Sequence, residues 1–263
     1  MRNSLSKMKL AASTLHLLHQ PLSEVLHKLI YLNTKNIEIA DSGYHALNPR
    51  LVEQLQEIRA SYDLEFSIHA PYADTNLSAD DDLIREWILK RIRYSIRFAN
   101  ELEAKCVVIH PGWTTATDRF MKGRAWELNI RSLHWLQKYS QEYGVPLLIE
   151  NVPEPTPYLL ITTNDFELFF SDEQIDMRMV LDIAHANLQS QVYDFLQDFG
   201  DKIDHIHVSD NRGSKDQHLP MGEGSINWER VMTSIRKIGF DGWIVIESYR
   251  DIDKSIKYLN SFI

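Results

Sequence analysis

The sequence has one cysteine, no long apolar run and few basic residues. Cys106 has no partner for an internal disulfide, and its place in an apolar run predicts a buried thiol. No apolar stretch approaches the roughly 20 residues that span a bilayer, and the first ten residues do not form a signal peptide. We therefore expect a cytoplasmic protein without membrane contact.

Basic residues are too few to favour nucleic acid as a partner. The chain carries 28 Lys and Arg against 37 Asp and Glu, a formal net charge of −9. This balance gives no support to non-specific binding of nucleic acid, although a local basic groove could still exist. DNA is disfavoured as a partner but stays an open alternative.

The chain also lacks an internal boundary. No Gly-rich or Ser-rich linker and no low-complexity tract divides it. Its 263 residues match one (β/α)8 barrel of about 250 residues, and 44% apolar with 25% charged residues is typical of a globular protein. We expect a single domain over residues 1–263.

Short apolar runs alternate with amphipathic stretches throughout the chain. Strands are predicted over 10–14, 37–40, 65–69, 106–110, 147–150, 179–182, 203–208 and 243–247. Helices are predicted to begin near Pro21, Pro49, Ala79, Arg124, Asn164, Leu188, Asn227 and Asp253. The alternation predicts an α/β fold with a parallel sheet, and eight units predict closure into a single (β/α)8 TIM barrel.

The predicted helix from about 79 to 103 shows a clear apolar stripe. Spacings of three and four join Leu83, Trp87, Ile88, Ile92, Ile96 and Ala99. Such a stripe is typical of a helix that packs one face against a sheet.

Six predicted strands end in a residue of metal-ligand type. These residues are His69, His110, Glu150, Asp182, His207 and Glu247, and His185, Asp216 and His218 follow closely. In a parallel barrel the carboxyl ends of the strands meet at the active site. Burying these groups together without a cation would be costly. The mixed nitrogen and oxygen donors suit Zn²⁺, Mn²⁺ or Fe²⁺, and the number of donors allows one to three ions.

The motifs around these residues carry a family resemblance. The chain resembles the xylose isomerase-like barrel superfamily, which includes endonuclease IV and many sugar isomerases and epimerases. The similarity lies in His69-Ala-Pro-Tyr72, His110-Pro-Gly112, Glu150-Asn151, Asp182-Ile-Ala-His185, His207-Val-Ser-Asp210, Asp216-Gln-His218 and Gly222-Glu-Gly224. Resemblance to endonuclease IV implies three zinc ions: one on His69, His110 and Glu150, one on Glu150, Asp182, His207 and Glu247, and one on His185, Asp216 and His218.

The resemblance leaves the substrate open. Sugar epimerases of the superfamily hold one Mn²⁺-type ion on a Glu, Asp, His, Glu quartet, which Glu150, Asp182, His207 and Glu247 also match. The first sixty residues resemble the sugar isomerase/epimerase group. The loop after the second predicted strand offers Asp41, Tyr44 and His45, with no Arg before Arg50. Endonuclease IV inserts an Arg-containing loop there, so this departure weakens the DNA hypothesis and favours a small carbohydrate.

Two reactions fit the predicted site. In a sugar or sugar-phosphate isomerase or epimerase, Glu150 and Glu247 exchange the proton beside a metal-polarised carbonyl, while His185 and Lys215 hold sugar oxygens or a terminal phosphate. In a phosphodiesterase acting on abasic DNA or a small phosphoester, metal-activated hydroxide near Glu150 attacks phosphorus. A metal-binding barrel without catalysis is a third reading.

Further residues carry predictions with a structural alternative. Tyr72 and Trp113 are predicted to contact the substrate, although a Trp more often covers a barrel rim. His205 shares the face of His207, so it either orients that ligand or is a buried hydrogen-bonded His. Asp210 either accepts a hydrogen bond from a ligand imidazole or caps a turn. No helix stripe identifies an interface between subunits.

Overall fold

The computed structural model describes residues 8–262, in which eight parallel strands close into a barrel. Each strand pairs with the next in chain order, and β8 pairs with β1. The strands are β1 (Lys9–Ser13), β2 (Asn36–Ala40), β3 (Glu65–His69), β4 (Val107–Ile109), β5 (Leu147–Glu150), β6 (Arg178–Asp182), β7 (Ile203–Val208) and β8 (Trp243–Ile246). The predicted (β/α)8 TIM barrel is thereby confirmed.

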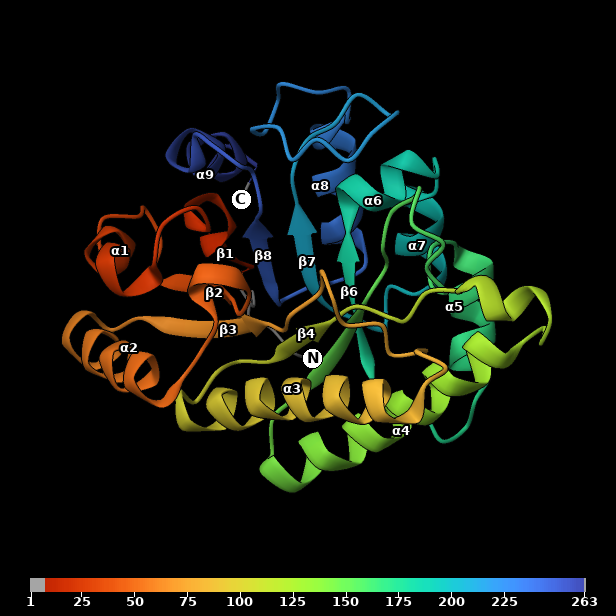
Figure 1. The fold of residues 1–263 in the computed structure, drawn as a ribbon. Coiled ribbons are helices and arrows are strands. Elements are labelled where there is room, and N and C mark those ends of the chain that lie inside the picture. The colour runs from red at the N-terminus through yellow and green to blue at the C-terminus, as the bar shows by residue number, and fades with distance from the viewer. Residues whose placement is uncertain (1–7, 263) are drawn as a thin grey trace, which may run out of the picture.

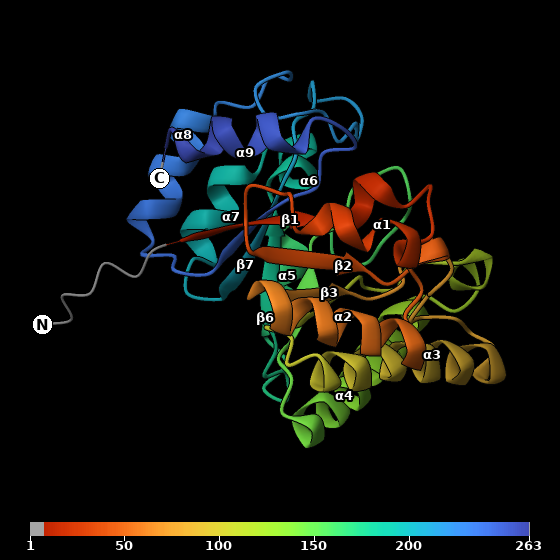
Figure 2. The same cartoon turned by 90° about the vertical axis from the view of Figure 1, so that its left-hand side faces the viewer.

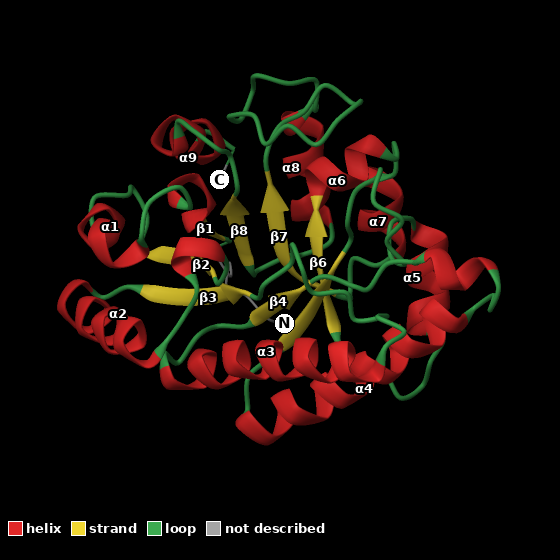
Figure 3. Ribbon diagram, in the orientation of Figure 1, coloured by secondary structure: helices red, strands yellow, loops and turns green. Residues whose placement is uncertain are grey.

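Helices form a ring outside the strands (Figure 1, Figure 3). They are α1 (Leu22–Leu29), α2 (Pro49–Tyr62), α3 (Asp82–Glu101), α4 (Arg124–Tyr143), α5 (Thr163–Phe170), α6 (Ile183–Leu188), α7 (Val192–Asp198), α8 (Trp228–Lys237) and α9 (Ile252–Asn260). Three 3-10 turns add η1 (Thr14–Leu17), η2 (Gly43–His45) and η3 (Ala116–Arg119). Over residues 8–262, none of the helices has the length and apolar character needed to cross a membrane.

Several helices begin where side-chain caps predict. Asn48 accepts a hydrogen bond from the Leu51 backbone N–H at 3.1 Å, and Pro49 takes the first helical position of α2. The helix α3 begins at Asp82, three residues after the predicted start near Ala79, and Asp81 accepts hydrogen bonds from its first turn. The caps supply acceptors for N–H groups that have no partner inside the helix.

The segment after β6 differs from the sequence prediction. Instead of one helix starting near Leu188, α6 begins at Ile183 and α7 follows at Val192. The carboxylate of Asp182, the last strand residue, accepts the backbone N–H of His185 at 2.7 Å and caps α6. The helix therefore starts directly after the strand, and His185 lies on a helix.

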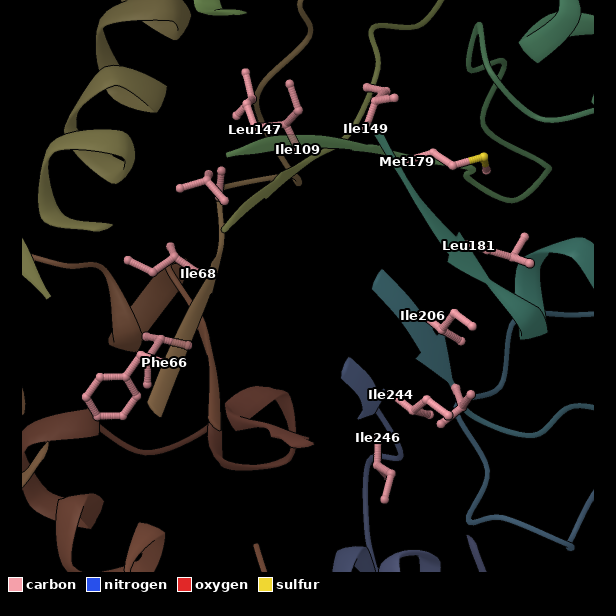
Figure 4. Packing of buried hydrophobic residues seen from close by; sticks show 14 of the residues in the cluster. Phe66, Ile68, Ile109, Leu147, Ile149, Met179, Leu181, Ile206, Ile244 and Ile246 are labelled. Carbon is pink, nitrogen blue, oxygen red and sulfur yellow. The ribbon is translucent and has the colours of Figure 1, made fainter. Parts of the chain in front are cut away.

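Alternation along the strands separates an apolar layer from a polar interior. Figure 4 shows Phe66, Ile68, Ile149 and other strand residues pointing away from the barrel interior. The residues between them face inward, as the two-residue period of a strand requires. Small apolar clusters, one containing Val108, Leu148 and Val180, fill part of the interior.

The stripe predicted on α3 is only partly correct. Ile88, Ile92 and Ile96 are buried, whereas the side chains of Leu83 and Trp87 are 77% and 71% exposed. Each helical residue turns by about 100°, so Trp87 lies well to one side of its neighbour Ile88. Both exposed residues line an outer groove between α3 and α4.

Strand register places the inward polar groups side by side. Figure 2 shows β1, β2 and β3 next to one another, and His69 of β3 is the register partner of Ala40 of β2. On the other side of the barrel, Asp182 of β6 is the register partner of His207 of β7. The last inward side chains of the strands therefore gather at the carboxyl end of the barrel.

Candidate metal centre and active site

A cavity of about 270 Å³ opens at the carboxyl ends of the strands. Its walls combine ligand-type residues with aromatic and proline side chains: Leu15, Ala40, His69, Tyr72, His110, Glu150, Pro153, Glu154, Pro155, Thr156, Tyr158, His185, Asp216, His218, Glu247 and Tyr249. Seven of the nine predicted ligands are among them. The other two, Asp182 and His207, are fully buried at 0% exposure and adjoin Glu150 and Glu247.

Four ligand-type residues form a compact quartet. Glu150, Asp182, His207 and Glu247 each offer one donor atom, and these atoms lie within 4.8 Å of one another. Nδ1 of His207 is 3.0 Å from Oε1 of Glu150 and 3.6 Å from Oε2 of Glu247. Oδ2 of Asp182 is buried and has no hydrogen-bond partner in the described chain. This unpartnered oxygen beside three other donors fits a divalent cation.

A second group shares Glu150 with the quartet. Nε2 of His69 and Nε2 of His110 each lie 3.1 Å from Oε2 of Glu150. Nδ1 of His69 is 2.9 Å from the carbonyl oxygen of Ala70, to which it donates a hydrogen bond. Its Nε2 is then free to act as a ligand. Glu150 therefore has one oxygen toward each group, the arrangement that a bridging ligand needs.

A third group, His185, Asp216 and His218, lines the same cavity. Nε2 of His218 is 3.0 Å and Nε2 of His185 is 3.6 Å from Oδ2 of Asp216. Nδ1 of His185 donates to the Asn151 carbonyl at 2.8 Å, and Nδ1 of His218 donates to the Glu247 carbonyl at 2.9 Å. Both imidazoles therefore present Nε2 to the cavity, as metal-ligating histidines do.

Buried carboxylates draw the neighbouring imidazoles toward the charged form. Burial lowers the pKa of His69, but the hydrogen bond and the charge of Glu150 outweigh burial and raise the pKa to about 9. The pKa of His185 rises to about 10 because Asp182 and Asp216 outweigh its burial. Burial dominates at two other groups: it raises the pKa of Asp182 to about 6 and lowers that of His110 to about 4. Positive charge is therefore favourable in the cavity, and a divalent cation would supply it.

The structure adds residues that the sequence analysis did not single out. Tyr158 and Tyr249 line the cavity with Tyr72, and the ring of Tyr249 stacks on His218 at 4.5 Å. Glu38 of β2 is completely buried and lies 3.0 Å from His207. The sequence signal for Glu38 is an inward-facing charge between two outward-facing isoleucines.

Two predicted substrate contacts are not among the cavity walls. Trp113 pairs with Tyr158 through an isolated antiparallel bridge, and the two rings meet edge to face at 5.6 Å. It therefore supports a wall residue without reaching the cavity. Lys215 is exposed and likewise absent from the walls. Tyr72 does line the cavity, with its ring 5.3 Å from that of His69.

The loop after β2 does not face the cavity as its sequence suggested. Asp41 is buried and accepts hydrogen bonds from Arg91, from the Ser95 hydroxyl at 2.7 Å and from the Leu47 backbone at 2.7 Å. His45 is also buried, and its nitrogens contact Thr14 and backbone carbonyls of the segment after β1. These two polar residues hold the loop to the barrel, so they are structural.

Asp210 stabilises the loop that carries Asp216 and His218. Its carboxylate accepts hydrogen bonds from the Gly222 backbone at 3.0 Å and from the Trp228 indole at 2.9 Å. A Cβ at Gly224 would lie 2.1 Å from Oδ1 of Asp210, so only glycine allows this close approach. Of the two roles open to Asp210, the contacts support loop capping.

Comparison with known proteins agrees with this geometry. A family model described as "Xylose isomerase-like TIM barrel" matches residues 33–262. An uncharacterized protein of Methanocaldococcus jannaschii is 32% identical, over 97% of this chain and 89% of its own length. The fructoselysine 3-epimerase of Shigella flexneri is 25% identical, over 86% of this chain and 85% of its own length.

Solved structures extend the similarity to three dimensions. The crystal structure of a D-tagatose 3-epimerase-like protein superposes with a TM-score of 0.90 at 30% identity and covers 97% of both chains. A crystal structure of the IolI protein with a zinc atom shares the fold, with a TM-score of 0.79 at 18% identity over 97% of this chain and 96% of its own. This chain belongs to the xylose isomerase-like TIM barrel family.

Proposed function

We propose that the protein is a divalent-metal-dependent epimerase or isomerase of a small carbohydrate. The observation that carries this proposal is the position of Glu150 and Glu247, two carboxylates of one four-donor quartet that also line one cavity. Epimerases among the relatives and solved structures support the same class of reaction. Family membership alone does not select the substrate.

The quartet is the proposed metal site. Glu150, Asp182, His207 and Glu247 would hold the cation, and their mixed donors suit Zn²⁺, Mn²⁺ or Fe²⁺. When bound, the cation supplies positive charge that polarises a substrate carbonyl and its neighbouring hydroxyl.

Glu150 and Glu247 are the proposed acid and base. One carboxylate removes the proton from the carbon beside the carbonyl, and the other returns a proton, which for an epimerase is delivered to the opposite face. His185, whose Nδ1 is engaged by the Asn151 carbonyl at 2.8 Å, keeps Nε2 toward the cavity and holds a sugar oxygen. The proline residues of the loop after β5, Pro153 and Pro155, wall the cavity and restrict water.

The cavity walls favour an unphosphorylated sugar. Among the wall residues in the described part of the chain there is no Lys or Arg, whereas Glu154 and Asp216 add negative charge. Protein sites that bind phosphate ordinarily use Arg, Lys or a helix N-terminus. The rings of Tyr72, Tyr158 and Tyr249 instead provide apolar faces with hydroxyl groups, which suit a neutral sugar.

A specific observation supports a second candidate function. The groups around His69 with His110, and around Asp216 with His185 and His218, add donors that one cation does not need. An endonuclease IV-like phosphodiesterase with up to three ions would use all nine. The same lack of basic wall residues and the net charge of −9 argue against DNA as its substrate.

One set of assays separates the two functions. Protein purified without chelator is analysed for bound metal, then assayed with Zn²⁺ or Mn²⁺ on a panel of ketoses, ketose phosphates and an abasic-site duplex. Incorporation of solvent deuterium at a sugar carbon supports the epimerase. Strand cleavage without deuterium incorporation would replace it with the phosphodiesterase, and metal content near zero under metal-replete conditions would contradict both.

A further inference from the structure

A buried polar network extends from His207 of the quartet into the barrel interior. It consists of Glu38 on β2, Ser67 on β3, His205 and His207 on β7, and Cys106, which directly precedes β4. None of the five side chains is more than 2% exposed. An ionisable group buried this deeply is costly unless it is paired, so the contacts of Glu38 require an explanation.

Both oxygens of Glu38 are engaged by neighbours on other strands. Oε2 accepts a hydrogen bond from the Ser67 hydroxyl at 2.8 Å and another from Nε2 of His205 at 3.0 Å. Oε1 lies 3.0 Å from Nε2 of His207. The two atoms lie within ion-pair distance of each other, and neither has a well-aligned hydrogen-bond partner in residues 8–262. The carboxylate therefore joins three strands at one point.

The chemistry of a carboxylate decides which atoms of this network donate hydrogen bonds and which accept them. An ionised carboxylate only accepts hydrogen bonds, so His205 turns a protonated Nε2 toward Glu38. Both nitrogens of His207 face a carboxylate, Nδ1 that of Glu150 and Nε2 that of Glu38, so a cation bound at Nδ1 would take the place of the proton on that atom and leave the other on Nε2. In neutral His205 the proton on Nε2 leaves Nδ1 as an acceptor, and the thiol of Cys106 lies 3.9 Å from that atom. In neutral His207 the same tautomer leaves the lone pair on Nδ1, the atom 3.0 Å from Glu150.

His207 differs in this respect from three other predicted ligands. His69, His185 and His218 are each oriented by a backbone carbonyl, at 2.9, 2.8 and 2.9 Å respectively. They present Nε2 to the cavity, whereas His207 presents Nδ1. A carboxylate partner raises the basicity of a ligand imidazole more than a neutral carbonyl does.

We propose that Glu38 is a positioning residue of the metal centre, which presents Nδ1 of His207 to the cation and is itself held by Ser67 and His205. This inference rests on the proposed function, because it takes the quartet as the metal site. Glu38 does not line the cavity, so it acts on the reaction only through His207.

Replacement of Glu38 tests the inference through metal affinity. Glu38→Gln keeps the size of the side chain but removes its charge. It also places an N–H donor where the neighbouring groups are donors and require an acceptor. We expect metal affinity, measured by competition with a chromophoric chelator, to fall by about 10- to 100-fold. The visible spectrum of the Co²⁺-loaded protein is expected to shift, because one nitrogen ligand is weakened. Ser67→Ala, which removes one donor to Glu38, is expected to have a smaller effect in the same direction.

Asp41→Asn is the matched control. Asp41 lies three residues from Glu38 and is equally buried, but its side chain contacts Arg91 and Ser95 rather than the side chain of a predicted ligand. It is expected to lose stability and to keep the affinity and the Co²⁺ spectrum of the unchanged protein. Equal affinities for the Glu38→Gln variant and the unchanged protein would overturn the inference while leaving the proposed metal site intact. Absence of binding by the unchanged protein would instead contradict the proposed function.

A measurement on the unchanged protein serves if Glu38→Gln fails to fold. In protein loaded with ¹¹³Cd and labelled with ¹⁵N at histidine, we expect scalar coupling from cadmium to Nδ1 of His207 and a proton retained on its Nε2. His69, His185 and His218 retain their proton on Nδ1. Cadmium coupling to Nε2 of His207 would overturn the inference.

Discussion

Two regions at the same end of the barrel carry buried polar residues for different purposes. At the ends of β3 to β8 and in the loop after β7, some polar atoms remain without a hydrogen-bond partner in the described chain, including Oδ2 of Asp182 and Oδ1 of Asp216. After β2, the carboxylate of Asp41 and the ring of His45 are fully engaged by Arg91 and by backbone groups. Position at a strand end is therefore not enough to identify a ligand. The useful criterion is whether a carboxylate or imidazole keeps a donor atom that faces other ligand-type groups.

This difference implies that substitutions have separable effects in the two regions. Removing a donor from the strand-end cluster should reduce metal binding and turnover. Removing a polar group after β2 should reduce the free energy of unfolding, because it leaves buried partners unsatisfied, without changing the metal site.

The largest expected effect is at Glu150. Glu150→Gln removes a proposed acid or base and the oxygen shared by two ligand groups, so we expect turnover to fall by about 10²- to 10⁴-fold. The measurement is solvent deuterium incorporated into a ketose that the unchanged protein epimerises. Unchanged turnover would show that the reaction takes place elsewhere.

Removal of the metal is expected to affect stability as well as activity. A ligand at 100 times its dissociation constant stabilises the folded state by about 2.7 kcal/mol. For a chain of this size, chelation is then expected to lower the melting temperature by roughly 5–10 °C. Thermal unfolding with and without chelator measures this change in melting temperature. Recovery of the original melting temperature on addition of Zn²⁺ or Mn²⁺ is the control. Identical melting curves would contradict a tightly bound cation.

Substitution in the region after β2 is expected to reduce stability without changing metal binding. Asp41→Asn weakens the contacts with Arg91 and Ser95, so we expect a loss of about 2 kcal/mol in the free energy of unfolding. Metal content per folded chain should stay unchanged. Urea unfolding gives the first quantity and metal analysis the second. Loss of metal without loss of stability would break the comparison between the two regions.

The smallest effect is expected at Lys215, which is exposed and does not line the cavity. Surface substitutions usually change the free energy of unfolding by less than about 0.5 kcal/mol. Because Lys215 also lies outside the cavity walls, Lys215→Ala is expected to leave kcat/KM for a neutral ketose within about twofold of its original value. A selective loss of activity on ketose phosphates would indicate that Lys215 binds a phosphate.

The period of the strands made much of this architecture predictable. In Ile37-Glu38-Ile39 and Val180-Leu181-Asp182, every second residue faces the same way, so a local pattern predicts which side chains point into the barrel. The structure brings the nine predicted ligands together around one cavity, and their roles in binding and catalysis remain predictions. Glu38 was not predicted because it lies one inward position before the end of β2, in the layer below the ligand-type residues.

Helix starts and loop contacts were less predictable, because they depend on partners distant in sequence. The early start of α6 depends on the side chain of Asp182, which caps the helix although it also belongs to a strand. The contacts of Asp41 come from Arg91 and Ser95, about 50 residues further along the chain. No local pattern shows that these groups meet.

The sequence by itself determined the (β/α)8 barrel and the type of residue at each strand end, since both follow from short-range periodicity and from the parallel direction of the strands. The tertiary structure alone decided which polar atoms are free to bind and which are already satisfied. That distinction depends on strand register and on contacts between distant segments, which place Glu38 against His207 and Arg91 against Asp41.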